Sequence, residues 1–98
     1  MELENKRTAY EDQRIAQLKE WGAQISILKA KAQMAKVDVK NDYFTVINAF
    51  QHKQDEAKTE LQELKAVGDD VWEDLKTETE RSWSEVKAAY QDATLRFI

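Results

Sequence analysis

The chain has 98 residues, a length that fits a single domain, which we expect to span residues 1–98. Charged residues make up 35% of it, there are two glycines and there is no proline, so the composition favours long helices over a sheet or a loop-built active site. The absence of cysteine excludes disulfides and thiolate metal sites.

The hydropathy pattern indicates a soluble protein. The N-terminal segment Met1–Arg7 lacks the apolar core of a signal peptide. The longest uncharged run, Tyr43–Gln51, is far shorter than the roughly 20 residues that cross a bilayer. We therefore expect a cytoplasmic location.

An apolar stripe predicts a long first helix, from about residue 6 to residue 67. Its members recur three, four or seven residues apart, which keeps them on one helix face. The packing residues expected in this helix are Trp21, Ile25, Leu28, Val39, Tyr43, Val46, Phe50, Leu61 and Leu64. Gly22 is interpreted as a local weakening of the helix. Asn41-Asp42 is a candidate break, but the apolar residues keep helical phase across it, so we interpret the helix as continuous.

The segment Gly68-Asp69-Asp70 predicts a turn. Gly68 stands where a helix C-terminus favours glycine, and Asp70 can cap the next helix with Glu73 at its third position. The alternative is one uninterrupted helix of about 90 residues, because Leu64 and Leu75 keep the same phase across the glycine.

A second helix is predicted from about residue 70 to residue 96. Its expected packing residues are Trp72, Leu75, Trp83, Val86, Tyr90 and Phe97. The slot occupied by Leu61 recurs after eleven residues as Trp72 and again as Trp83, and this period is typical of straight or slightly right-handed helix packing.

The two helices are expected to form an antiparallel hairpin, an all-α coiled coil. The second helix is the shorter one and would cover residues 40–66, so water would be left in contact with Trp21, Ile25, Leu28 and Val39. This exposure predicts a homo-oligomeric bundle or a helical partner.

The net charge of −4 is unevenly distributed. Residues 1–50 contain eight basic and seven acidic residues, and residues 51–98 contain seven basic and twelve acidic residues, so the halves carry +1 and −5. Opposite charges favour the second half lying beside the first, although an exposed ion pair contributes only about 0–1 kcal/mol.

The sequence offers no catalytic, cofactor-binding or metal-binding constellation. His52 is the only histidine, and a bridging-carboxylate metal motif would need a glutamate at the position of Ala49. The acids Asp69 and Asp70 are interpreted as helix caps and not as calcium ligands. We therefore expect a protein that is not an enzyme.

Nucleic acid and lipid are two further partners that the surface residues bear on. The lysines Lys29, Lys31, Lys36 and Lys40 are interpreted as a solvated helix flank, because an acidic protein is a poor ligand for nucleic acid. Eleven-residue amphipathic repeats with aromatic residues are also typical of lipid-surface helices. The acid-rich polar face would be repelled by anionic lipid, so a lipid-surface role is the alternative to protein packing.

Some segments of the chain are distinctive when taken together: Lys19–Trp21, Lys29–Ala32, Asp38–Tyr43, Ala57-Lys58, Leu61–Ala66, Ser82-Trp83, Arg96-Phe97 and, most specifically, Gly68–Lys76 followed by Trp83. In this order they resemble a family of small bacterial and cyanobacterial coiled-coil stress-response proteins. The resemblance covers nearly the whole chain and implies an all-helical, cytoplasmic protein with a stress-related role. It carries over no catalytic residue. We expect a non-enzymatic structural or interaction protein that self-associates through its apolar stripe.

Overall fold

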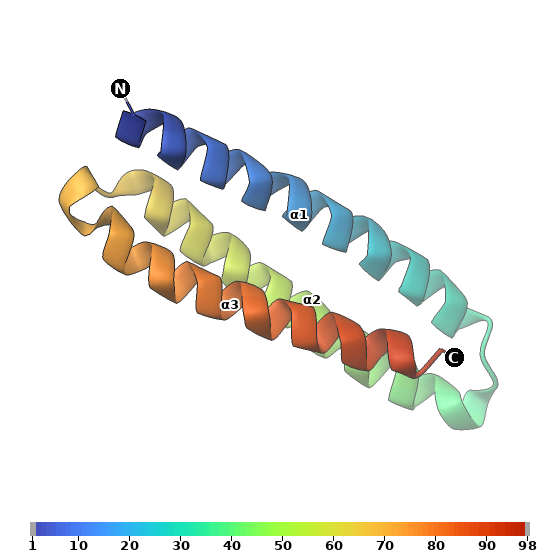
Figure 1. Cartoon of the computed structure of the whole chain (residues 1–98). Helices are drawn as coiled ribbons and strands as arrows, with labels where there is room; N and C mark the ends of the chain where they lie inside the picture. Colours follow the sequence, from blue (N-terminus) through green and yellow to red (C-terminus); the bar gives the residue numbers. More distant parts are fainter. Residues whose placement is uncertain (1, 98) are drawn as a thin grey trace.

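A computed structural model describes the backbone of residues 2–97 and the side chains of residues 5–97. Three helices make up the fold: α1 (Glu2–Gln33), α2 (Val37–Ala66) and α3 (Asp69–Leu95). They run up, down and up, so α1 and α3 are parallel and α2 is antiparallel to both (Figure 1). The all-helical prediction is confirmed, since the described residues contain no strand.

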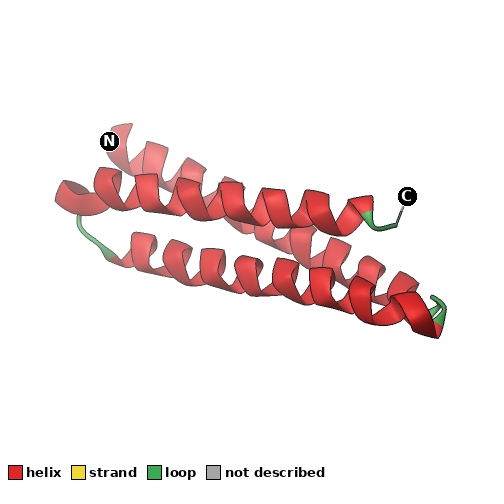
Figure 2. Ribbon diagram, turned by 90° about the horizontal axis from the view of Figure 1, so that it is seen from below, coloured by secondary structure: helices red, strands yellow, loops and turns green. Residues whose placement is uncertain are grey.

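The three helices form a triangular bundle. The Cα atoms extend over 54 × 19 × 18 Å, so the cross-section is about as deep as it is wide. After a 90° turn, α1 still lies lengthwise along the other two helices (Figure 2). No helix in the described part of the chain is both long enough and apolar enough to cross a membrane.

The prediction of one continuous helix from residue 6 to residue 67 is wrong, so the fold has three helices and not two. The predicted antiparallel hairpin is present in its second part, where α3 lies along α2. The chain leaves helical geometry between Gln33 and Val37, where Lys36 has extended backbone angles of φ −64° and ψ 149°. No glycine, proline or side-chain cap hydrogen bond marks this break. Tertiary packing explains it, because the break lets α1 fold back and bury its own apolar face.

The turn at Gly68 is present, and the single-rod alternative is wrong. α2 ends at Ala66, and Val67 and Gly68 are both extended, with Gly68 at φ −75° and ψ 167°. The predicted cap assignment differs in detail, because Gly68 and not Asp70 occupies the N-cap position. Asp69 and Asp70 lie instead in the first turn of α3, where negative charge is favoured by the helix dipole.

The core lies along the shared axis of the bundle. The fully buried apolar side chains are Trp21, Ile25, Leu28, Ala32, Ile47, Phe50, Ala57, Leu61, Leu64, Trp72, Trp83, Val86 and Ala93. The expectation that Trp21, Ile25 and Leu28 would remain exposed is therefore wrong, since they are 8%, 5% and 3% exposed within a single chain. Val39, expected to be exposed with them, is half-buried. The apolar stripe of α1 is therefore covered by the rest of the same chain.

Candidate functional site

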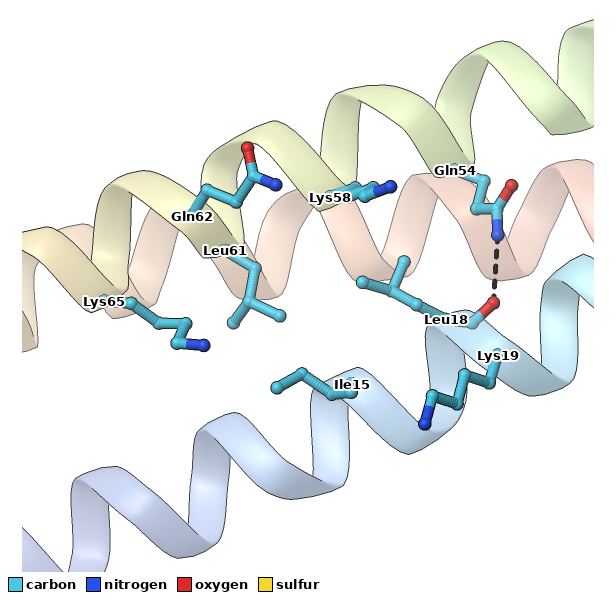
Figure 3. A pocket seen from close by; sticks show the side chains of 8 residues that line it. All are labelled: Ile15, Leu18, Lys19, Gln54, Lys58, Leu61, Gln62 and Lys65. Atoms are coloured by element: carbon cyan, nitrogen blue, oxygen red, sulfur yellow. Dashed lines mark hydrogen bonds between the residues drawn. The ribbon is translucent and has the colours of Figure 1, made fainter.

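A groove with a mainly apolar lining lies between α1 and α2. It has a volume of about 320 Å³ and is shown in Figure 3. Eight residues line it: Ile15, Leu18 and Lys19 from α1, and Gln54, Lys58, Leu61, Gln62 and Lys65 from α2. The groove opens on the side of this helix pair that α3 leaves uncovered.

The floor of the groove is aliphatic. Ile15 and Leu18 are half-buried and pack against the core, whereas Leu61 is only 3% exposed. Ile15 and Leu18 are three residues apart and therefore share one face of α1. Leu61 lies on the side of α2 that faces them. A hydrogen bond of 2.9 Å from Gln54 Nε2 to the Leu18 carbonyl oxygen ties the helices together beside the floor. The floor is thus held by both helices.

The rim of the groove is cationic. Lys19 belongs to the α1 wall, and Lys58 and Lys65 belong to the α2 wall, so ammonium groups flank the floor on both sides. Among the side chains of residues 5–97, none of these lysines lies within ion-pair distance of a carboxylate. Their charge is therefore available to a ligand.

A second groove, on the α2–α3 side, has the opposite charge. Glu60, Glu63 and Glu78 line it together with Leu75 and Thr79. No basic residue of the described part of the chain lines that groove. The two grooves flank the same helix, so α2 separates a basic surface from an acidic one.

Aromatic rings and cations fill the contact between α1 and α3. The guanidinium of Arg14 lies 4.8 Å from the centre of the Tyr10 ring and 5.3 Å from that of Trp83. Tyr10 meets Trp72 edge to face at 5.6 Å, and the Trp83 Nε1 atom donates a 2.6 Å hydrogen bond to Gln17 Oε1. Such cation–π and aromatic pairs contribute about 0.5–2 kcal/mol each. This contact stabilises the bundle and offers no reacting group.

Burial also affects the acidity of Tyr10. Desolvation raises the pKa of its hydroxyl, and the nearby Arg14 guanidinium opposes that rise. The side chain is consequently neutral at physiological pH, which suits its place between cations and tryptophan rings.

Arg7 fastens the start of α1 to the α2–α3 turn, a role that no sequence pattern indicated. Its Nη2 atom donates to the Val67 carbonyl oxygen at 2.9 Å and to that of Leu64 at 3.4 Å, and its Nη1 atom contacts the Asp69 carboxylate. Carbonyls at a helix C-terminus lack partners within the helix. Only the return of α1 to the end of α2 brings Arg7 to them.

All fifteen residues predicted to pack are buried or half-buried. Those that are fully buried are Trp21, Ile25, Leu28, Phe50, Leu61, Leu64, Trp72, Trp83 and Val86. Those that are half-buried are Val39, Tyr43, Val46, Leu75, Tyr90 and Phe97. Ring pairs between α2 and the C-terminal part of the chain include Tyr43–Phe97 at 4.4 Å and Phe50–Tyr90 at 5.3 Å.

Ile47 is fully buried but was not among the predicted packing residues. The predicted stripe followed Val46 and Phe50, as expected for a helix with one neighbour. Since α2 contacts two helices, it buries a wider face, and Ile47 lies on the side of the stripe nearer Lys58 and the α1 contact.

His52 is an exposed surface residue. Its Nε2 atom lies 2.8 Å from Glu56 Oε1, one helical turn away, and 73% of its side chain is exposed. Across the described residues, no group of three or more histidine, aspartate or glutamate side chains is placed to hold a metal ion.

Comparison with known proteins gives no relative. No protein-family model, curated protein or solved structure matches this chain. The stress-related role implied by the sequence resemblance, and the cytoplasmic location, therefore stay predictions.

Proposed function

We propose that this chain is a non-enzymatic interaction protein that self-associates by exchanging α1 between two copies. The main observation in support of this exchange is the break between α1 and α2. Here a helix ends and another begins with no glycine, proline or side-chain cap, although α1 buries Trp21, Ile25 and Leu28 on the far side of the break.

The residues at the break make few contacts that would stabilise the bend. Met34, Ala35 and Lys36 all have good helix propensity, and Met34 is 87% exposed, so bending the chain here buries almost none of that side chain. Val37 is 85% exposed on the other side of the break. A straight linker would lose few contacts and would gain helical hydrogen bonds.

A straight linker removes α1 from its own bundle. If residues 34–36 became helical, one helix would run from Glu2 to Ala66 and would be about 98 Å long at 1.5 Å per residue. Its first half could then pack only against the α2–α3 pair of a second copy. The same contacts would form between chains as within one, which is the usual basis of domain swapping.

The burial of the stripe bears on the lipid-surface alternative. Few large apolar side chains remain exposed: Met34 and Val37 flank the α1–α2 break, Leu95 ends α3 at the same end of the bundle, and Ile27 and Val71 lie elsewhere. So small a set of exposed apolar residues is ordinary on folded proteins. Binding to a lipid surface would require the bundle to open, whereas exchange of α1 keeps every buried residue in its present surroundings.

The substitution Val37→Pro tests the exchange. Residue 37 is the first residue of α2, where proline is well tolerated, and Lys36 already has the extended angles that a residue before proline prefers. The bent chain therefore accepts the change, whereas a continuous helix would lose about 3 kcal/mol or more. Val37→Ala is the matched control, because alanine suits both forms.

Light scattering after size-exclusion chromatography, with small-angle scattering, measures the outcome. After refolding at high concentration, we expect the unmodified chain and Val37→Ala to give a dimer about 100 Å long. Val37→Pro is expected to be a monomer near the 54 Å length of the single bundle. A monomeric unmodified chain at every concentration, or equal dimerisation of the proline variant, would refute the exchange.

A further inference from the structure

We infer that the basic groove between α1 and α2 is a binding site for a small anionic amphiphile, a straight-chain alkyl carboxylate. The groove combines an aliphatic floor, made by Ile15, Leu18 and Leu61, with three ammonium groups on its rim. This pairing of chemistries fits a ligand with a hydrocarbon tail and one negative head.

The size of the groove favours a small ligand over a protein segment. Its volume of about 320 Å³ lies within the range of small-molecule sites, which are concave and mostly apolar with a few placed polar groups. A docked helix would need a wide apolar face. Here the exposed apolar surface is restricted to parts of Ile15 and Leu18, because Leu61 is nearly covered.

The shape of the groove suits an extended chain. Its α2 wall runs from Gln54 to Lys65, which is about 16 Å at 1.5 Å per residue. The Gln54–Leu18 hydrogen bond ties the two helices together at the Gln54 end, and they diverge from there towards Lys65 (Figure 3), so the slot exists before a ligand arrives. A preformed slot spares the ligand the cost of ordering the protein.

The charges of the groove select an anion. Lys19, Lys58 and Lys65 have no carboxylate partner among residues 5–97, and no acidic residue of that part of the chain lines the groove. A carboxylate above the floor would accept hydrogen bonds from ammonium groups that otherwise contact only water. The acidic groove beside Glu60 and Glu63 has the reverse preference.

The site does not depend on the exchange of α1. In a swapped dimer, α1 of one copy would lie on α2 of the other and would rebuild the same groove. Binding is therefore expected of monomer and dimer alike.

Dodecanoate, used below its micelle-forming concentration, is the probe. We expect one molecule to bind per groove in calorimetric titration and to shift the methyl signals of Ile15, Leu18 and Leu61 in NMR spectra. Dodecyltrimethylammonium has the same tail and the opposite charge, so it should leave those three methyl signals unmoved. Circular dichroism at each point shows that the helices persist.

A charge-neutralising variant tests the rim. Replacing Lys19→Gln, Lys58→Gln and Lys65→Gln together changes only exposed side chains, so the fold should survive, and the affinity for dodecanoate should fall at least about tenfold. The matched control is Lys6→Gln, Lys31→Gln and Lys36→Gln, which removes equal charge from exposed positions outside the groove. Unchanged affinity in the groove variant, an equal loss in the control, or methyl shifts with both amphiphiles would overturn the proposal.

Discussion

Glycine at position 22 is not required by the packing of α1 on α2. A Cβ atom built there would lie 3.5 Å from Gln54 Nε2, an ordinary van der Waals distance, and the backbone has no positive φ angle. The residue therefore brings the flexibility of glycine into the middle of a helix without gaining a close approach in return.

We expect Gly22→Ala to stabilise the protein by about 1 kcal/mol, because alanine loses less backbone entropy in a helix. Urea denaturation followed by circular dichroism measures the change. The exposed neighbour Ala23 provides the converse control, since Ala23→Gly should lose a similar amount. A loss of stability in Gly22→Ala would mean that the new methyl group disturbs the Gln54–Leu18 hydrogen bond.

Tyr10 makes stability depend on pH in the alkaline range. Because burial raises the pKa of its hydroxyl in the folded state, the unfolded chain loses that proton first. The stabilisation is complete below the ordinary tyrosine pKa of about 10 and is lost as the pH rises through the folded value. Urea denaturation between about pH 8 and pH 11 should show this fall, and Tyr10→Phe should show a smaller one. Parallel curves for the two proteins would contradict the assignment.

At the scale of helices, the sequence predicted correctly that these segments are helical, but it did not predict where the first helix ends. The periodic stripe identified helical residues on both sides of position 35, and the glycine and acids at 68–70 identified the second turn. The first turn carries no such signal. It exists because burial of Trp21 and Leu28 outweighs the local preference for continuing the helix.

The parts of the candidate site that depend on contacts between helices could not be predicted from the sequence. The lysines of the groove belong to different helices, and only the return of α1 brings Lys19 opposite Lys58. Arg7 and Ile47 were missed for the same reason, since each is defined by a neighbour that a two-helix arrangement does not provide.

The two halves of α1 differ in how deeply they are buried. Within the described side chains, residues 5–20 include no fully buried one, whereas residues 21–32 include Trp21, Ile25, Leu28 and Ala32. We expect native-state hydrogen exchange to show weaker protection in residues 5–20 than in residues 21–32, because opening the first half exposes less apolar surface. Uniform protection along α1 would show that the polar and aromatic contacts of Arg7, Tyr10 and Arg14 stabilise it as much as the buried core does.

At the scale of the whole molecule, charge is divided between the helices. α3 contains eight acidic and three basic residues, whereas α1 contains five acidic and six basic ones. Opposite charges form ion pairs between helices, such as Arg7 with Asp69 and Lys53 with Glu85. The side of the bundle away from α3 keeps the basic groove.

An odd number of helices has a mechanical consequence. Because α1 and α3 are parallel, the described chain enters at one end of the bundle and leaves at the other (Figure 1). Two proteins fused before α1 and after α3 would be held apart by the full 54 Å length of the bundle. The fold can therefore serve as a rigid spacer in an engineered fusion, a use for which a two-helix hairpin, with both ends on one side, is unsuited.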